Sequence, residues 1–278
     1  MYKFANITPG IVFDLPFYGK VYVPGQFSEA FAENTKCHFF HSDDLENLSD
    51  LVNFLSKGGI AVLKGDWKSA AKLPERLRKY RDELIAPFID EARQKGTIRN
   101  PRTRRWLNRR YQQTLSHIML LAHNDIFPEI KPSPRIPHLL ELLGDKLDAV
   151  NDLPILAPLP VVLKILSALE NGHYISAFDM EIFSPPNVLA PFSQDTVDLF
   201  AEALQIAGDY IKTHELEILD MGCGSGVLTL LAANVLDDRN IHIFSTDILP
   251  EAVAATKINA QRFNQKSNTN VKIETTES

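Results

Sequence analysis

Apolar positions recur at helical spacing through much of the N-terminal part of the chain. Two long patterns begin at Pro74 and Arg102, and the second runs to Leu121. Short alternating runs within residues 11–23, interrupted by a turn, are typical of a β-hairpin. We therefore expect residues 1–175 to form a mixed, mostly helical domain that contains a β-hairpin.

The pattern then changes to strands that alternate with helices. A strand-like run over residues 217–220 is followed by an apolar helix and by a second strand-like run over residues 241–247. A helix over residues 250–263 and a strand from Val271 continue this order. Repeated strand–helix–strand units predict a parallel sheet, so we expect residues 176–278 to fold as an α/β domain.

A glycine-rich turn lies between the first of these strands and the apolar helix. Asp220 precedes it, and Gly222, Gly224 and Gly226 follow at a spacing of two and two. Glycine lets the backbone approach a ligand closely, and a helix that starts after such a turn points its amides at the ligand. A dinucleotide-binding turn would place its third glycine one position later, where Val227 stands. The turn favours a nucleotide-like cofactor and argues against a dinucleotide.

The string Asp-x-Gly-x-Gly-x-Gly at residues 220–226 and the corner Thr246-Asp247-Ile248 resemble class I S-adenosylmethionine-dependent methyltransferases. The resemblance implies a Rossmann-like fold and S-adenosylmethionine as the cofactor. Asp247 would accept hydrogen bonds from both ribose hydroxyls, since a carboxylate has two oxygens for two vicinal donors. Ile248, with Leu249, would form an apolar wall for adenine. The amino-acid end of the cofactor would lie on Asp220 and on the backbone of Gly222, Cys223, Gly224 and Gly226.

Residues 184–196 resemble the segment that precedes the glycine turn in the small-domain methyltransferases. Members of that group modify a release-factor glutamine, ribosomal proteins or bases of ribosomal RNA. The proline-arginine-proline string of the group is not present in this chain. Gln194 and Thr196 are candidates to reach the cofactor, and Ser193 or Asp195 is an equally good candidate to cap the next helix.

The family's sheet has seven strands, of which this sequence supplies about three. We therefore expect residues 176–278 to be the N-terminal half of the S-adenosylmethionine-binding domain, and the sequence to be a fragment of a longer enzyme. The Asn-Pro-Pro-Tyr-like string that amide- and base-methylating members keep would follow residue 278. The catalytic residues are expected there too, and the fragment alone is expected to be inactive.

The resemblance implies transfer of a methyl group to a nucleophilic atom. We expect the acceptor to be a nitrogen of a macromolecule, either protein or RNA, and residues 1–175 to be its substrate-recognition domain. Two alternatives stay open. One is a small-molecule methyltransferase, which an apolar and neutral cavity would favour. The other is a non-catalytic nucleotide-binding or scaffold protein.

One stretch of the chain carries charge of a single sign. Between Arg93 and Arg110, eight positions are Lys or Arg and none is acidic. Together with Trp106 and Tyr111, this block predicts contact with a polyanion, either RNA or an acidic protein surface. The alternative is that these cations pair with the acids of residues 82–91 or are solvated. A formal net charge of −6 argues against nucleic acid coating the whole surface.

Neither secretion nor a membrane span is expected. The N-terminus has no apolar leader core, and the longest apolar stretch, residues 153–169, is interrupted by prolines and a lysine. Two cysteines, Cys37 and Cys223, are too few for a disulfide framework, so we expect a cytoplasmic protein. Cys37, His38 and His41 lack a second ligand pair at zinc spacing, so we expect a polar turn there and no metal site.

Overall fold

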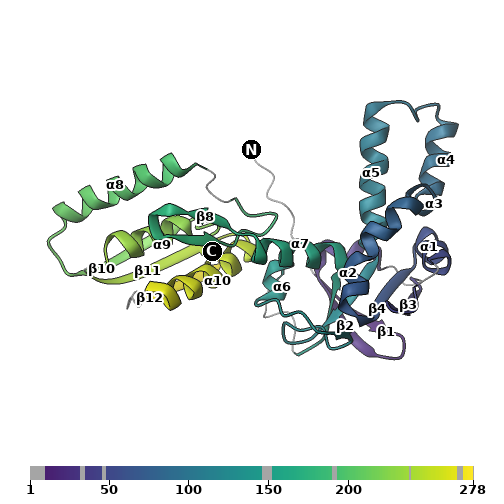
Figure 1. Ribbon diagram of the computed structural model, residues 1–278, viewed down its shortest axis with the longest axis horizontal. Helices are drawn as coiled ribbons and strands as arrows, with labels where there is room; N and C mark the ends of the chain where they lie inside the picture. The colour runs from purple at the N-terminus through teal and green to yellow at the C-terminus, as the bar shows by residue number, and fades with distance from the viewer. Residues whose placement is uncertain are drawn as a thin grey trace. The chain divides into compact units, whose positions relative to one another are not determined.

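The computed structural model describes residues 10–31, 35–45, 48–145, 152–189, 193–237, 239–267 and 272–277. The chain divides into two compact units. The N-terminal unit consists of Met1–Ile136 and Asp148–Leu163, and the C-terminal unit consists of Pro137–Leu147 and Lys164–Ser278. The division passes through helix α7 (Leu159–Glu170). Each unit contains its own sheet and its own helices (Figure 1).

The N-terminal unit is built on a mixed sheet of seven strands. Their order is β1-β2-β7-β5-β4-β3, and β6 pairs with β4 beside this path. β1 and β2 form an antiparallel hairpin in which Ile11 lies opposite Val23, which confirms the predicted hairpin. The strands are β1 (Ile11–Leu15), β2 (Gly19–Val23), β3 (Cys37–His41), β4 (Ile60–Asp66), β5 (Ile118–Ala122), β6 (Ile130–Lys131) and β7 (Ile155–Pro158).

The sequence did not predict a sheet of this size, which lies beside the helices that the apolar spacing indicated. β5 is buried at every residue, and β4 is buried at its first four. A strand that is buried on both faces carries a continuous apolar run, so its pattern does not distinguish a strand from a helix. For this reason Ile118 and Leu121 fit the helical spacing that begins at Arg102, although both belong to β5.

The helical pattern that begins near Pro74 is divided among several short segments. Pro87 accounts for the last of these divisions, because it has no backbone N–H to donate to the preceding turn and stands at the start of a new helix. The helices of the unit are η1 (Gly25–Ala30), α1 (Ser49–Ser56), α2 (Trp67–Arg76), η2 (Leu77–Tyr80), α3 (Arg81–Leu84), α4 (Ala86–Gln94) and α5 (Pro101–Leu115).

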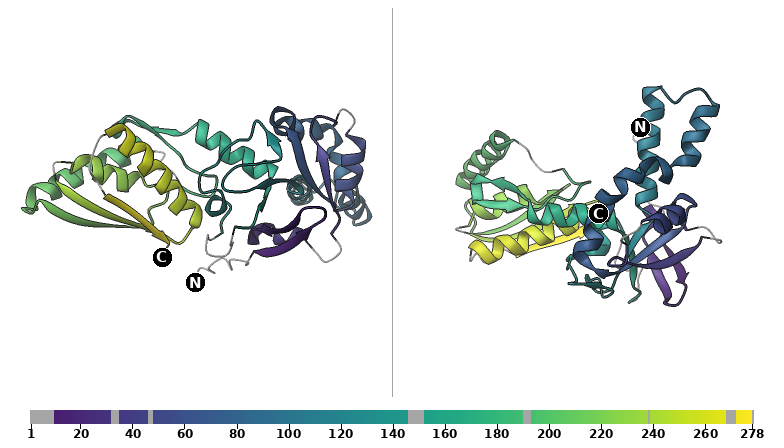
Figure 2. Two further views of the ribbon diagram at one scale, coloured as in Figure 1. Left: turned by 90° about the horizontal axis from the view of Figure 1, so that it is seen from below. Right: turned by 45° about the vertical axis from the view of Figure 1, so that its right-hand side comes forward.

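α4 and α5 lie side by side and extend away from the sheet of their unit (Figures 1 and 2). The start of α5 is set by Asn100, whose side chain accepts a hydrogen bond from the backbone N–H of Arg102 at 2.9 Å, and by Pro101 at the first helical position. The rings of Phe88 and Trp106 pack edge to face with centroids 5.8 Å apart and join the two helices. We call this pair the α4–α5 hairpin.

The C-terminal unit contains a parallel sheet in the order β10-β11-β12. Ile218 lies opposite Ile243, which in turn lies opposite Ile273. The predicted alternation of strands and helices is confirmed. The elements are α6 (Leu139–Leu142), β8 (His173–Ile175), η4 (Ser176–Phe178), β9 (Met180–Ile182), α8 (Gln194–Tyr210), β10 (Glu215–Met221), α9 (Val227–Val235), β11 (Asn240–Asp247), α10 (Pro250–Ser267) and β12 (Lys272–Glu277).

Apolar side chains of α9, β11 and α10 form the core of the C-terminal unit. Leu230, Leu231, Ile241, Ile243 and Phe263 are all at most 2% exposed. Full burial of a side chain of this size contributes about 1.5–3 kcal/mol. The core therefore holds α9 and α10 firmly against the sheet, and the carboxyl ends of β10 and β11 meet at one edge of it.

Candidate functional site

The turn between β10 and α9 requires glycine at specific positions. Gly224 and Gly226 have φ angles of 56° and 80°, in the left-handed region that other residues rarely adopt. A Cβ atom on Gly226 would lie 2.9 Å from the side chain of Thr256 on α10. The turn thus approaches α10 too closely for any side chain at this position, and Gly226 begins α9 as its N-cap.

Asp247 lies beside this turn at the end of β11. Its Oδ2 accepts a hydrogen bond from the backbone N–H of Gly224 at 3.0 Å, and its Oδ1 accepts one from the N–H of Leu249 at 3.0 Å. A carboxylate offers about four acceptor positions, so about two of them are left for other donors. The structure therefore places an oriented carboxylate against the backbone of the turn.

Asp220, near the end of β10, is held by a side chain of α9 that also contacts β11. The hydroxyl of Thr229 on α9 donates to Asp220 Oδ2 at 2.6 Å, and it lies 2.8 Å from the hydroxyl of Ser245 on β11. Thr229 and Ser245 are both buried, so the carboxylate of Asp220 is fixed by partners that water does not displace.

The thiol of Cys223 is buried and contacts a side chain of α10. Burial raises the pKa of this thiol to about 11, and the hydroxyl of Thr256 lies 3.3 Å from Sγ and 3.1 Å from the carbonyl oxygen of Gly224. A thiol with this pKa is neutral near pH 7, and only the thiolate is a strong nucleophile. The side chain of Cys223 is therefore excluded as an attacking group.

A buried amide ties the segment after β9 to the turn. Asn259 on α10 is fully buried; its Nδ2 donates to the carbonyl oxygens of Phe183 at 2.7 Å and Ser225 at 2.8 Å. Its Oδ1 accepts from the N–H of Phe183 at 2.9 Å. The carbonyl oxygen of Leu189 lies 3.4 Å from the place a Cβ on Gly224 would take. The segment from Phe183 to Leu189 thus lies against the turn.

Apolar side chains follow Asp247 directly. Ile248 is 57% exposed and Leu249 is 40% exposed, so both present apolar surface directly after Asp247. The structure therefore brings together, at one sheet edge, the residues that the sequence singled out. These are Asp220, Gly222, Cys223, Gly224, Gly226, Asp247 and Ile248.

The residues before α8 take other positions. Gln194 Oε1 lies 3.4 Å from the N–H of Ser176, and its Nε2 donates to Asp198 at 2.8 Å, so its amide is engaged away from the turn. Ser193 stands at the N-cap of α8 but makes no capping hydrogen bond with its side chain. Pro191 and Phe192 lie outside the described residues.

Four polar residues that the sequence analysis did not name support the site. They are Thr229, Ser245, Thr256 and Asn259, and each is buried among apolar neighbours. A single polar residue on the buried face of an apolar helix or strand must find a partner inside the protein. That isolation was the signal in the sequence, and the partners are the carboxylates and the backbone around the turn.

The stretch around Cys37 differs from its prediction. Cys37–His41 form the strand β3 and not a polar turn, and burial raises the pKa of Cys37 to about 11. Within the described ranges there is no group of three or more His, Cys, Asp and Glu side chains arranged to hold a metal ion. None of the helices in those same ranges has the length and apolar character needed to cross a membrane.

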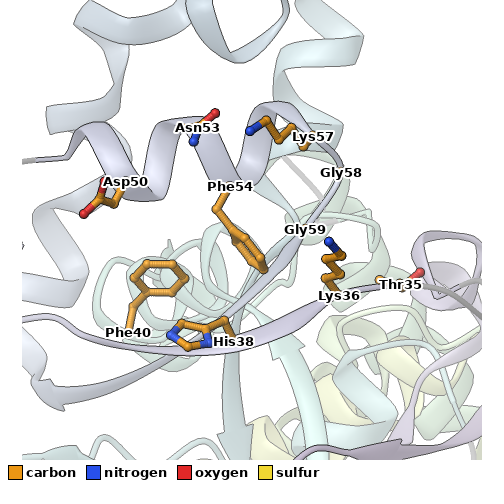
Figure 3. Close-up of a pocket in the computed structure, with 10 residues that line it drawn as sticks. All are labelled: Thr35, Lys36, His38, Phe40, Asp50, Asn53, Phe54, Lys57, Gly58 and Gly59. Carbon is orange, nitrogen blue, oxygen red and sulfur yellow. The ribbon is translucent and has the colours of Figure 1, made fainter.

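A hollow of about 810 Å³ lies in the N-terminal unit between β3 and α1 (Figure 3). The rings of His38, Phe40 and Phe54 face one another there, with centroid distances of 5.2–6.2 Å. Lys36 and Lys57 lie at its rim. No motif in the sequence indicated this hollow. Its rings mainly contact one another, and it lacks the paired acids and the glycine backbone found at the turn.

The turn and the two acids identify the class of the C-terminal unit. Parallel strands, left-handed glycines and an acid at the end of β11 that binds the turn backbone are the features of a class I S-adenosylmethionine-dependent methyltransferase domain. The C-terminal unit is a domain of this class.

Comparison with known proteins gives a more particular likeness. Residues 198–278 match the family model described as ribosomal protein L11 methyltransferase (PrmA). The ribosomal protein L11 methyltransferase of Lachnospira eligens is 33% identical over 93 residues, which make up 34% of this chain and 26% of that protein. The match thus spans about a quarter of the length of this curated relative.

Proposed function

We propose that this protein uses S-adenosylmethionine to methylate a nitrogen atom of a protein. The observation that carries the proposal is the contact between Asp247 Oδ2 and the N–H of Gly224, 3.0 Å apart. This contact fixes a carboxylate beside the glycine backbone of the turn, so one ligand can bind the carboxylate and the backbone together. A nucleoside joined to an amino acid is a ligand of this kind.

The residues around the turn fit the cofactor. The two free acceptor positions of Asp247 match the two hydroxyls of a ribose, and Ile248 with Leu249 offers apolar surface to an adenine ring. The buried hydroxyl of Ser225 has no hydrogen-bond partner within the described part of the chain, so the turn keeps a polar group that a ligand can satisfy. Asp220 and the backbone of Gly222–Gly226 would hold the amino-acid end.

The protein's own contribution to the reaction is alignment. When bound, S-adenosylmethionine would supply a methyl group whose bond to the positively charged sulfur breaks as a bond to the acceptor nitrogen forms, with S-adenosylhomocysteine as the leaving group. Because this group is already activated, holding donor and acceptor in line and excluding water provide most of the acceleration. Asp220 and Asp247 act as binding groups in this scheme, and no catalytic base is assigned among the described residues.

The choice of a protein acceptor is supported by the matching family, the ribosomal protein L11 methyltransferases. RNA and small molecules are the competing acceptors. With the whole protein, a methyl-labelled donor and dissociated ribosomes, we expect the label to be incorporated into protein. Protease treatment should release this label, and ribonuclease treatment should not. Label that appears instead in a low-molecular-weight fraction would favour the small-molecule alternative.

Calorimetry with S-adenosylhomocysteine tests the cofactor site. We expect the wild-type protein to bind and Asp247→Ala to bind about 10- to 150-fold more weakly, since a charged hydrogen bond contributes about 1.5–3 kcal/mol. Asp237→Ala is the matched control, because Asp237 is an exposed acid after α9 in the same unit. Equal affinity in the wild type and Asp247→Ala would remove the ribose assignment.

The cell compartment follows from the same proposal. Methylation of a ribosomal protein takes place where ribosomal proteins are made, and we propose the cytoplasm. Cys37 and Cys223 are both free thiols, which suits a reducing compartment.

A further inference from the structure

The α4–α5 hairpin carries its charge unevenly. α5 has five arginines and no acid along its length. A hollow of about 500 Å³ on this hairpin includes Glu91 as the one acid among its lining residues. Its lining cations are Lys95, Arg102, Arg109 and Arg110. We call this site the basic hollow.

A different hollow of the same hairpin has balanced charge. It has a volume of about 660 Å³, and it is lined by Arg81, Arg93 and Arg104 together with Asp82, Glu83 and Asp90. Two of these cations are paired, Arg81 with Asp82 at 3.0 Å and Arg93 with Asp90 at 3.2 Å. Arg104 therefore stands on the same helix as the basic hollow but among acids, which makes it a matched reference position.

The arginines of the basic hollow are not neutralised by described residues. Arg102 and Arg109 are exposed, and neither forms an ion pair with any acid in the described ranges. The carboxylate of Glu91 is already paired with Lys95. Neighbouring charges of one sign repel each other, so an anion bound in the hollow would stabilise this arrangement.

One aromatic side chain, Trp106, lines the basic hollow beside Arg110. The guanidinium of Arg110 lies 4.9 Å from the ring centroid of Phe88 and 5.6 Å from that of Trp106. Such cation–π contacts hold a guanidinium in a defined place. Trp106 is only partly buried and lines the hollow, so a flat apolar surface stands beside the cations.

We propose that the basic hollow binds single-stranded RNA. Arg102 and Arg109 are two helical turns apart, roughly 10 Å along the axis of α5, so their charges match a run of phosphates better than a single anion. Guanidinium groups bind phosphate oxygens in pairs of hydrogen bonds. An accessible indole stacks on unpaired bases, which a duplex does not offer. An acidic protein surface would use the arginines but leave the indole without a role.

This binding goes beyond the methyl transfer proposed above and does not depend on it. The basic hollow belongs to the N-terminal unit, whereas the glycine turn belongs to the C-terminal unit. RNA binding and cofactor binding can therefore succeed or fail separately in experiments on the same protein.

Fluorescence anisotropy with a labelled single-stranded RNA of mixed sequence tests the proposal. We expect Arg102→Gln/Arg109→Gln to weaken binding about tenfold at physiological salt and to reduce the slope of log affinity against log salt by about 1.4, that is, about 0.7 for each phosphate that is no longer neutralised. Arg104→Gln should bind like the wild type within about twofold. Trp106→Leu should weaken binding with little change in the salt slope, because stacking releases no counterions.

Three results would overturn the proposal. The first is an unchanged affinity and salt slope in Arg102→Gln/Arg109→Gln. The second is an equal loss in Arg104→Gln, which would indicate a diffuse charge effect. The third is equally tight binding of polyglutamate, which would point to an acidic protein instead. Melting curves confirm that each variant is folded, and unchanged S-adenosylhomocysteine binding shows that the cofactor site is intact.

Discussion

Gly226 shows how single residues set the geometry of the glycine turn. It combines a φ of 80° with a close approach of its Cα to Thr256, whereas Gly222 has a φ of 77° and open space where its Cβ would stand. A residue with a Cβ would therefore have a strained backbone at either position, but its Cβ would overlap with a neighbour only at position 226. The two glycines can be used to separate these effects.

Urea unfolding of the two alanine variants makes the separation. Gly222→Ala should lower the free energy of unfolding by about 1 kcal/mol, the cost of a left-handed conformation for a residue with a Cβ. Gly226→Ala should lower it by about 3 kcal/mol, since α10 must also move to admit the new methyl group. Equal losses in the two variants would contradict the close packing of the turn on Thr256.

At this scale the sequence singled out residues that the structure brings together at one turn, and their roles in cofactor binding stay predictions. Gly222, Gly224, Gly226 and Asp247 are recognisable because their residue types and spacing are tied to backbone conformation and to ligand chemistry. Thr229 and Asn259 were not predicted, because a lone polar residue in a helix does not reveal which partner it meets. Their partners come from other elements, and only the packed structure shows them.

At the scale of elements, α10 does more than cover the sheet. Asn259 satisfies both backbone groups of Phe183 and the carbonyl of Ser225, and so joins the segment after β9 to the glycine turn through one side chain. Every one of these groups is shielded from water, so no solvent can replace the amide.

Asn259→Ala should therefore lower the free energy of unfolding by about 3 kcal/mol, because three buried polar groups lose their partner. It should also speed hydrogen exchange at the amide of Phe183. Asn264→Ala is the control, since Asn264 is exposed on the same helix. A similar stability for both variants would show that Asn259 does not hold the segment in place.

Prediction of elements succeeded where strands and helices keep distinct periods. The β1–β2 hairpin and the order β10-α9-β11-α10-β12 follow from alternation, glycine positions and helical spacing. The prediction of a helix was wrong for β5, whose apolar residues form an unbroken buried strand. The helical pattern from Pro74 is divided into short segments, and Pro87 explains the last division, before α4, which the apolar spacing alone does not predict.

At the scale of the whole molecule, the two units differ in how far their topology can be predicted from the sequence. The sheet of the N-terminal unit joins strands far apart in the chain, as where Tyr22 of β2 pairs with Ile155 of β7. Local periodicity carries no information on such distant pairing. The C-terminal unit is built from neighbouring strand–helix units, and its topology follows from their order.

The central claim is that the glycine turn of the C-terminal unit holds S-adenosylmethionine through Asp247. A crystal structure of the protein saturated with S-adenosylhomocysteine tests it most directly. We predict both ribose hydroxyls within hydrogen-bonding distance of the Asp247 carboxylate, with the adenine ring against Ile248. An empty turn at saturating ligand, or a ligand found only in the ring-lined hollow beside β3, would contradict the claim.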